Sequence, residues 1–253
     1  MELLPAIFFG ITGLFFGSFF LVIAQHAATG RSFVMGRSKC DFCSRVLSWS
    51  ELIPVISFVL LRGKCKHCKK KLSLWYPISE LITAFVFLSI ALYVTSLFPM
   101  IVLSIIASCL LVIFFSDREF EIIPVQFVLL ACLAELVMLL ATPSLLLNHF
   151  LSGSGAAAFF YAIYLVTKKR GMGFGDVIFA FLMGFILGFP YIIFGLYLSF
   201  LSGACISLLL VALKKKKLHG GTVPFGPFLV FGTFIMMVWG EHIAYFISKY
   251  VGF

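Results

Sequence analysis

The sequence predicts an all-α polytopic membrane protein with about eight transmembrane helices. Of the 253 residues, 62% are hydrophobic and only 11% are charged, whereas a soluble domain is about a quarter charged. The mean hydropathy is +1.14, and the apolar residues are gathered into long runs separated by polar segments. These observations exclude an ordinary soluble domain and place the core in a lipid bilayer.

Eight apolar runs approach the roughly 20 residues that cross a bilayer. We expect spans at residues 3–24, 77–97, 99–116, 122–141, 145–166, 177–189, 191–213 and 223–247. The sixth is short and contains Gly184 and Gly188, so it is the weakest of the eight. The first run has no basic segment before it and no small-residue cleavage site, so we expect a retained helix and not a signal peptide. No internal repeat is evident.

The basic residues are distributed on one side of the predicted membrane. Four polar segments, 25–76, 117–121, 168–176 and 214–217, follow one another along the chain with two crossings between each and the next, so all four share one face. Of the 19 Lys and Arg, all but Lys249 fall in these segments. The positive-inside rule then places them in the cytoplasm and both termini outside. The net charge of +9 is thereby explained without a nucleic-acid partner.

This topology predicts three parts. Residues 1–24 form the first transmembrane helix, residues 25–76 a cytoplasmic four-cysteine loop, and residues 77–253 a seven-helix membrane domain. The loop is the one candidate for a separate soluble subdomain.

Four of the seven cysteines form two C-x-x-C pairs in the polar loop, Cys40 with Cys43 and Cys65 with Cys68. Two such pairs suit a tetrahedral four-thiolate zinc site, which is structural because no position is left for water. A redox dithiol and a pair of disulfides are the alternatives, and a reducing cytoplasm argues against the disulfides. His67 lies between ligands and is a weaker candidate. The other cysteines, Cys109, Cys132 and Cys205, lie singly in apolar runs and are expected to be buried hydrophobic residues.

Two of the three aspartates end or begin apolar runs. Asp117 ends the third span and Asp176 begins the sixth, with an out-and-back pair of spans between them. Intramembrane acids are costly and are functional-site candidates. Two close carboxyl groups share a proton, one acting as base toward water and the other as acid toward a carbonyl. We therefore expect an aspartic-protease dyad, the alternative being two unrelated interfacial acids.

Glycines 171, 173 and 175 precede Asp176 in Gly171-Met172-Gly173-Phe174-Gly175-Asp176. They disfavour helix and allow another backbone to approach closely. We expect this loop to bind an extended substrate strand, the alternative being that the glycines merely interrupt a helix.

Several motifs together resemble the bacterial type IV prepilin peptidases. Asp117 with Ile123-Pro124 resembles the first aspartate motif of that family. The glycine loop with Asp176 is similar to the second, the GxGD motif shared with presenilin-type intramembrane proteases. Further segments match in order over nearly the whole chain: Gly17-Ser18-Phe19, the four-cysteine loop, Tyr76-Pro77-x-x-Glu80 and Pro224-Phe225-Gly226-Pro227-Phe228.

The resemblance implies an enzyme of the bacterial cytoplasmic membrane that removes the basic leader from prepilins or pseudopilins of pili, secretion or competence systems. Asp117 and Asp176 would be catalytic and the four cysteines would hold zinc. Many members then methylate the new N-terminus with S-adenosylmethionine. No soluble-type S-adenosylmethionine motif is present, so this second activity is implied by the resemblance alone. Glu80 and Glu51 are candidates for the methylation site.

The chain departs from the family pattern near both aspartates, and its four-cysteine loop lacks the proline that many members have after the first cysteine. Val125 replaces the Asp or Asn that often follows Ile-Pro, and Ile178 replaces a Lys that often stands two residues after the second aspartate. Any positive partner of the dyad would then be Arg118 or one of residues 168–170.

The remaining ionisable residues favour structural roles. We expect Glu135, in the fourth span, to bond a neighbouring helix, and we interpret His26, His149, His219 and His242 as interfacial. The alternatives to a bifunctional enzyme are a peptidase without methyltransferase activity and a non-catalytic zinc-binding scaffold or transporter. A transporter would need a polar path across the membrane, yet the span interiors hold few ionisable groups besides Glu135 and Glu241.

Overall fold

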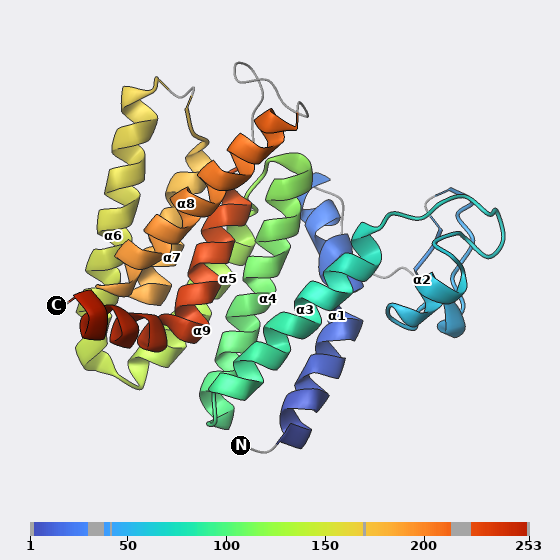
Figure 1. The fold of residues 1–253 in the computed structure, drawn as a ribbon, viewed down its shortest axis with the longest axis horizontal. Helices are drawn as coiled ribbons and strands as arrows, with labels where there is room; N and C mark the ends of the chain where they lie inside the picture. The colour runs from blue at the N-terminus through green and yellow to red at the C-terminus, as the bar shows by residue number, and fades with distance from the viewer. Residues whose placement is uncertain (1–2, 30–37, 41, 169–170, 214–223, 252–253) are drawn as a thin grey trace. The chain divides into compact units, whose positions relative to one another are not determined.

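A computed structural model describes residues 3–29, 38–40, 42–168, 171–213 and 224–251. The described chain is helical (Figure 1). Its elements are α1 Leu3–Thr29, η1 Trp49–Glu51, α2 Ile56–Leu60, α3 Trp75–Tyr93, α4 Leu97–Phe120, α5 Val125–Leu140, α6 Pro143–Val166, α7 Phe174–Leu187, α8 Tyr191–Ala212 and α9 Gly226–Val251. Of the basic residues used to predict topology, Arg31, Arg37, Lys169, Arg170 and residues 214–217 lie outside the described residues, as does His219.

The predicted all-α membrane architecture is confirmed: one helix corresponds to each of the eight predicted spans. Six of these helices are long and apolar enough to cross a bilayer, namely α1, α3, α4, α6, α8 and most of α9. Helices α5 and α7 are shorter, with 16 and 14 residues. At 1.5 Å per residue, α7 is about 21 Å long, less than the hydrocarbon thickness of about 30 Å.

The main difference from the predicted spans is at Asp117. The sequence predicts a polar break from residue 117, but α4 continues to Phe120. It ends at Glu121, whose φ of 54° is incompatible with a further helical turn, and Pro124 then prevents helix in the preceding residue. Asp117 therefore lies in the last turn of a helix and not in a loop.

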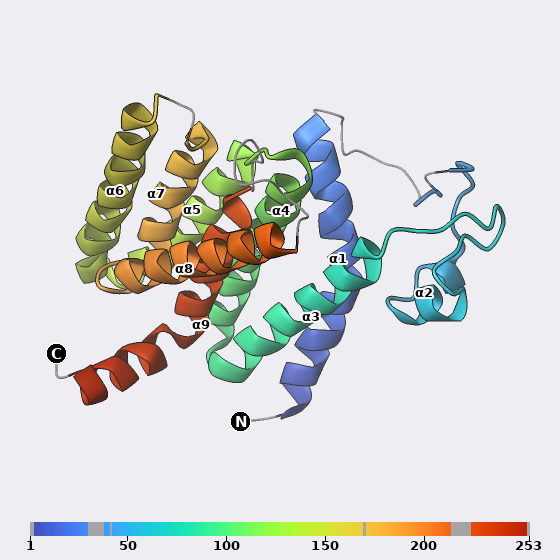
Figure 2. The ribbon, with the colours of Figure 1, turned by 45° about the horizontal axis from the view of Figure 1, so that its top comes forward.

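The described chain divides into two compact units, residues 1–100 and 101–253. In the first, α1 packs along α3, as Figures 1 and 2 show. The contact is close because α1 presents glycines to α3. A Cβ on Gly13 would lie 2.7 Å from the carbonyl oxygen of Thr83, and one on Gly17 would overlap the backbone of Glu80. Small residues at such positions are typical of membrane helix pairs.

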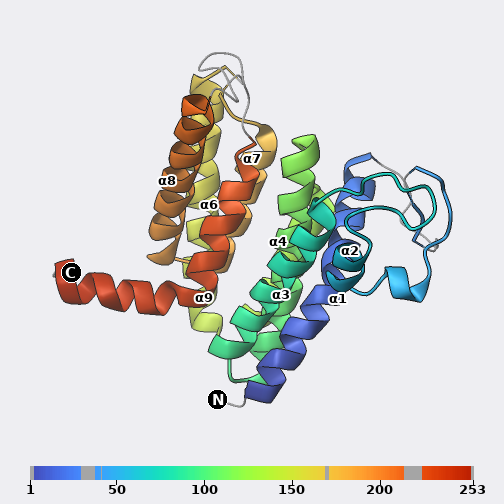
Figure 3. The same cartoon turned by 45° about the vertical axis from the view of Figure 1, so that its right-hand side comes forward.

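In the second unit, α7 is the central helix. It packs against α5, α6, α8 and α9, and nearly all its residues after Gly175 are buried. A helix that is apolar all round is expected at such a position. Figure 3 shows α6, α8 and α9 around it, with the end of α9 turning aside toward the C-terminus. Asp176 thus begins a helix that is held on several sides.

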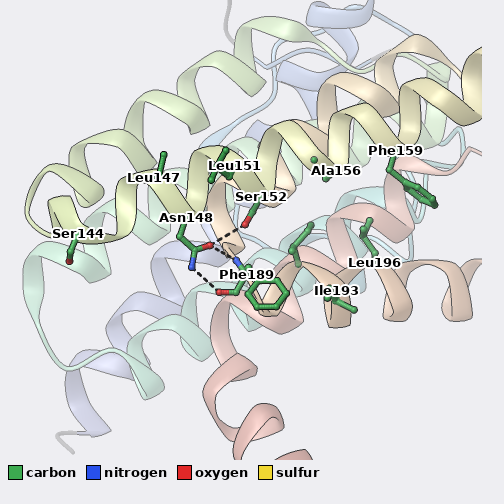
Figure 4. Close-up of a pocket in the computed structure, with 12 residues that line it drawn as sticks. Ser144, Leu147, Asn148, Leu151, Ser152, Ala156, Phe159, Phe189, Ile193 and Leu196 are labelled. Atoms are coloured by element: carbon green, nitrogen blue, oxygen red, sulfur yellow. Dashed lines mark hydrogen bonds between the residues drawn. The ribbon is translucent and has the colours of Figure 1, made fainter. Parts of the chain in front are cut away.

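The other end of α7 is fixed by side chains from α6. His149 Nδ1 lies 2.8 Å from the carbonyl oxygen of Phe185, and the Asn148 amide exchanges two hydrogen bonds with the backbone of Phe189, of 2.8 and 3.0 Å. Figure 4 shows Asn148 bonded in this way. His149 Nδ1 also lies 3.7 Å from Glu135 Oε1. Glu135 therefore faces a neighbouring helix, as expected, and His149 lies against that helix end as well.

Beside this end, α6 and α8 border an apolar groove of about 700 Å³ lined by Leu147, Leu151, Phe159, Ile193 and Leu196 among others (Figure 4). Its walls are carbon-rich, as expected of a surface that faces lipid.

Candidate active site and metal centre

Asp117 is held at the end of α4 by the start of α9. The residue is 6% exposed. Its Oδ2 accepts a hydrogen bond of 2.9 Å from the backbone N–H of Gly226, the first residue of α9. A Cβ on residue 226 would lie 2.5 Å from that oxygen. Glycine is therefore required for the backbone to come this close to the carboxyl group.

Asp176 lies in the first turn of α7 and is 9% exposed. Its Oδ2 accepts a hydrogen bond of 3.1 Å from the N–H of Gly173. The Gly173 backbone is extended, with φ −76° and ψ 152°, and it caps the helix. A carboxyl group at this position also benefits from the positive end of the helix dipole.

The fold brings the two predicted aspartates together. Their carboxyl groups are close enough for their charges to interact. Ile123, from the segment that follows α4, packs against Gly175 in α7, where an added Cβ would lie 3.2 Å from the Ile123 Cβ. The Ile123-Pro124 motif thus joins the helix end that carries Asp117 to the helix start that carries Asp176.

The three glycines of the predicted substrate loop occupy different positions. Gly173 is the extended helix cap and Gly171 precedes it, both exposed, whereas Gly175 lies inside α7. Gly175 therefore packs against Ile123 and is not part of an extended edge. Among the described residues of the loop, Gly173 has the extended backbone expected for strand pairing, whereas Gly171 and Met172 lie in a bend.

The two C-x-x-C pairs lie in turns of the same backbone pattern, spanning residues 38–47 and 63–72 (residue 41 excepted). The N–H of Cys40 bonds the carbonyl of Arg45, and that of Cys65 bonds the carbonyl of Lys70, each at 2.9 Å. Single antiparallel bridges, Lys39 with Val46 and Lys64 with Lys71, close the two turns. The structure thus corrects the expectation of no internal repeat, because K-C-x-x-C recurs 25 positions on as a short structural repeat.

Ser44 and Lys69, the residues after the second cysteine of each turn, have positive φ of 54° and 57°. Such φ values are uncommon outside glycine. Their recurrence at equivalent positions indicates that both turns serve one geometric purpose.

The arrangement of the four cysteine sulfur atoms fits a bound metal ion. The four sulfur atoms all lie within 4.8 Å of one another, and the Sγ atoms of Cys40 and Cys68 are 3.9 Å apart. Ligands at about 2.3 Å around tetrahedral zinc are separated by about 3.8 Å. Backbone N–H groups of Cys68 and His67 lower the pKa of Cys65 to about 7, which favours the thiolate that a metal requires. The hydrogen bond from the Arg45 backbone lowers the pKa of Cys43, but burial and the neighbouring thiols outweigh it and raise that pKa to about 11, so the geometry of the four sulfur atoms carries the assignment.

Glu80 joins the loop between α1 and α3 to both helices. The residue is 8% exposed. Ser18 of α1 donates a short hydrogen bond to its Oε1, and the backbone N–H of Val55 donates one of 2.7 Å to its Oε2. Both oxygens of this candidate methylation-site residue are therefore engaged in holding the fold.

Val55 has an unusual conformation. Its φ of 59° and ψ of −49° form a γ-turn, closed by the bond from the Ile56 N–H to the Pro54 carbonyl. This turn is rare and strained, more so for a β-branched residue. The hydrogen bond to Glu80 is one interaction that stabilises it.

Glu51, the other candidate, is engaged locally. Its Oε2 accepts bonds from the Ser48 N–H and hydroxyl, at 2.9 and 2.7 Å. These bonds, first the backbone one, lower the pKa of Glu51. The arrangement is a helix cap for η1.

The sequence interpretation missed three contributors to these sites: Gly226, Ser18 and Val55. The first two stand in the quoted Pro-Phe-Gly-Pro-Phe and Gly-Ser-Phe motifs, so those motifs marked the positions without giving roles. Val55 carries no signal in the sequence.

Comparison with known proteins assigns both halves of the chain. A family model described as "Bacterial Peptidase A24 N-terminal domain" matches residues 11–94, and one described as "Type IV leader peptidase family" matches residues 104–208. No solved structure matches the chain.

Curated relatives carry the name prepilin leader peptidase/N-methyltransferase. That of Bacillus subtilis (strain 168) is 30% identical over 245 residues, 94% of this chain and 96% of the relative. That of Aeromonas hydrophila is 28% identical over 213 residues, 82% of this chain and 73% of the relative. That of Pseudomonas aeruginosa is 28% identical over 234 residues, 87% of this chain and 77% of the relative.

Proposed function

Because the chain belongs to the bacterial type IV prepilin leader peptidase family, peptidase A24, we propose that it is an aspartic endopeptidase that removes the leader from prepilins or pseudopilins. The observation that carries the proposal is that Ile123, just after α4, packs against Gly175 in α7, so that Asp117 and Asp176 lie near enough for their charges to interact. Asp117 and Asp176 are the proposed catalytic residues. The one-sided charge supports a cytoplasmic position for the site, with both termini outside.

The proposed mechanism needs one proton shared by two carboxyl groups. The pair titrates as a unit, so neither aspartate is given a fixed role. One carboxyl group takes a proton from a water that attacks the scissile carbonyl, while the other gives a proton to the carbonyl oxygen. The Gly226 and Gly173 N–H groups each fix one carboxyl oxygen, which orients the pair. The exposed backbone of Gly171 to Gly173 is proposed to bind the substrate strand before the cleavage point.

Isosteric substitution tests the dyad. Asp117→Asn and Asp176→Asn each keep an acceptor for the glycine N–H and remove the shared proton. Each is expected to lower leader cleavage of a purified prepilin by about 10²–10⁴-fold, the usual contribution of acid–base catalysis. Glu119→Gln, at an exposed acid in the same turn, is the matched control and should cleave normally. Near-normal cleavage by either Asn variant would contradict the dyad and favour a non-catalytic scaffold.

We also propose that the four cysteines hold one structural zinc ion, which would join the two turns. Metal analysis of the purified protein should give about one zinc per chain. Cys40→Ser and Cys65→Ser should lose it, whereas Cys205→Ser, at an exposed cysteine in α8, should keep it. A protein that is intact and contains no zinc would refute this site.

The names of the relatives support a second proposed activity, N-methylation of the cleaved pilin with S-adenosylmethionine. Glu80 and Glu51 are the residues proposed for that site, and because both carboxylates are hydrogen-bonded within the fold, we propose that they support it by holding the backbone. Incubation of cleaved pilin with a labelled methyl donor tests this activity. If an enzyme that cleaves prepilin transfers no label, the protein is a peptidase without methyltransferase activity.

A further inference from the structure

The part of the four-cysteine loop between the two turns exposes an apolar surface outside the predicted spans. It consists of Trp49, Leu52, Ile53, Ile56, Val59 and Leu60, and we name it the Trp49–Leu60 surface. Trp49 is 84% exposed, Leu60 77% and Val59 65%. Ile56, Val59 and Leu60 are spaced so that they share one face of α2. Exposed apolar patches rimmed by polar residues mark interaction sites.

The level of this surface is set by Glu80. Glu80 lies five residues after Trp75, the first residue of α3, which is about 7.5 Å along the helix axis. Its bond to the Val55 N–H holds the start of α2 beside the first turns of a predicted membrane span. Figure 1 shows α2 to one side of the start of α3. Trp75 and Tyr76 are of the kind found at the membrane interface.

The charge around the surface is positive. Arg45, Arg62, Lys64, Lys66 and residues 69–71 are all exposed. Among the described residues of the loop, Glu51 is the acid, and its carboxylate is held by Ser48. Basic residues beside exposed Trp and aliphatic side chains are typical of segments that lie in the headgroup region of anionic bilayers.

From these observations we propose that the Trp49–Leu60 surface docks into the lipid leaflet in which α1 and α3 are embedded, where its basic rim binds anionic headgroups. The loop would then be attached at three places: its two ends, which enter α1 and α3, and this surface. Glu80 and the strained turn at Val55 set the depth and direction of α2. The inference goes beyond the proposed function and requires only that the chain spans a bilayer.

Lipid quenching of Trp49 tests the proposal. The full chain with Trp75→Phe and Trp239→Phe retains Trp49 alone and is placed in phosphatidylglycerol-containing vesicles with or without bromine on the acyl chains. If Trp49 lies about 5–10 Å into the interface, brominated lipid should lower its emission by about half. Acrylamide in the aqueous phase should quench it little. Vesicles of phosphatidylcholine alone should show weaker lipid quenching.

Variants identify the residues responsible. Adding Ile56→Ser and Leu60→Ser should abolish lipid quenching of Trp49 and expose it to acrylamide. Phe42→Ser, at an exposed apolar residue on the first cysteine turn, is the matched control and should change neither. Hydrogen exchange at the Cys40 and Cys65 amides equal to that of the parent shows that the loop is folded in each variant.

Two results would overturn the proposal. Trp49 could stay open to acrylamide and insensitive to brominated lipid. Alternatively, it could become shielded from acrylamide only when a prepilin is added, which would assign the surface to a protein partner. Because fluorescence is read without cleavage, these results are independent of the test of the aspartates.

Discussion

The carboxyl groups of the two aspartates differ from that of Glu80 in how their oxygens are used. All three residues are buried, with exposures of 6%, 9% and 8%. Glu80 has a donor on each oxygen, from Ser18 and Val55. Asp117 and Asp176 each accept one bond on Oδ2 from a glycine N–H, and within the described part of the chain no donor to Oδ1 is found.

This contrast shows that burial of an acidic side chain in a span does not by itself separate a structural carboxyl group from a functional one. A buried carboxyl group is a site candidate because it is costly. The number of hydrogen-bond donors around the carboxyl group then distinguishes a structural role from a functional one. A carboxyl group with both oxygens bonded stabilises the backbone, whereas one fixed at a single oxygen is oriented and keeps the other oxygen available for a substrate or a water.

Outside the two aspartates themselves, the largest expected effect is at Gly226. Gly226→Ala should displace the Asp117 carboxyl group, because the new Cβ would lie 2.5 Å from Oδ2. Misplacement of a reacting group by about 1 Å can cost 10²-fold, so we expect cleavage to fall by about that factor in a prepilin assay. Gly155→Ala is the control, since a Cβ there has nothing within 4 Å. Full activity of the Gly226 variant would show that the N–H does not position Asp117.

How far the sequence predicts this arrangement depends on the range of each interaction. Hydropathy is a local property, so it gave eight helices and the order of the two aspartates. The C-x-x-C spacing is also local and predicted the cysteine cluster. The bond from Gly226 to Asp117 joins residues 109 positions apart, and no periodicity encodes it.

The helix ends were the least predictable part of the fold. Asp117 looked like a break because a charge normally ends an apolar run. The structure instead extends α4 through it, since Gly226 supplies a donor that offsets the burial of the carboxyl group. The strained Val55 turn could not be predicted either, because Glu80 lies 25 positions away and the sequence of the turn favours no positive φ.

A second prediction tests the holding role of Glu80. Glu80→Ala removes the acceptor of two donors, and each unsatisfied buried donor costs about 1–3 kcal/mol. We expect a lower unfolding temperature in detergent and faster proteolysis between α1 and α3. Glu241→Ala, at an exposed acid in α9, should leave both unchanged.

The variant Glu80→Gln distinguishes stabilisation of the fold by Glu80 from a direct part of its carboxylate in methyl transfer. The glutamine amide can accept from Val55 through oxygen and donate to the Ser18 hydroxyl through nitrogen, so most of the stability should return. If methyl transfer also returns, Glu80 holds the fold. If stability returns and methyl transfer does not, the carboxylate itself is needed, which would contradict a purely structural role.

A smaller effect is expected at Ser18. Ser18→Ala removes one donor and leaves the Val55 bond in place, so the loss should be about 1 kcal/mol. The double variant Ser18→Ala with Glu80→Ala should be little less stable than Glu80→Ala alone, because the two residues share one interaction. Additive losses in thermal unfolding would show that Ser18 stabilises α1 in another way.

The smallest expected effect is at Glu51, whose carboxylate caps a single turn at the half-exposed Ser48. Glu51→Gln weakens two charge-assisted bonds to neutral ones, and loss of a cap costs about 1 kcal/mol at most sites. We expect slightly faster hydrogen exchange at the η1 amides, unchanged zinc content and unchanged methyl transfer. Ser48→Ala should reproduce the exchange change, since it acts on the same cap from the other side. Loss of methyl transfer in Glu51→Gln but not in Ser48→Ala would reverse the assignment, because it would mean that Glu51 contributes its charge to a reaction and not its hydrogen bonds to a turn.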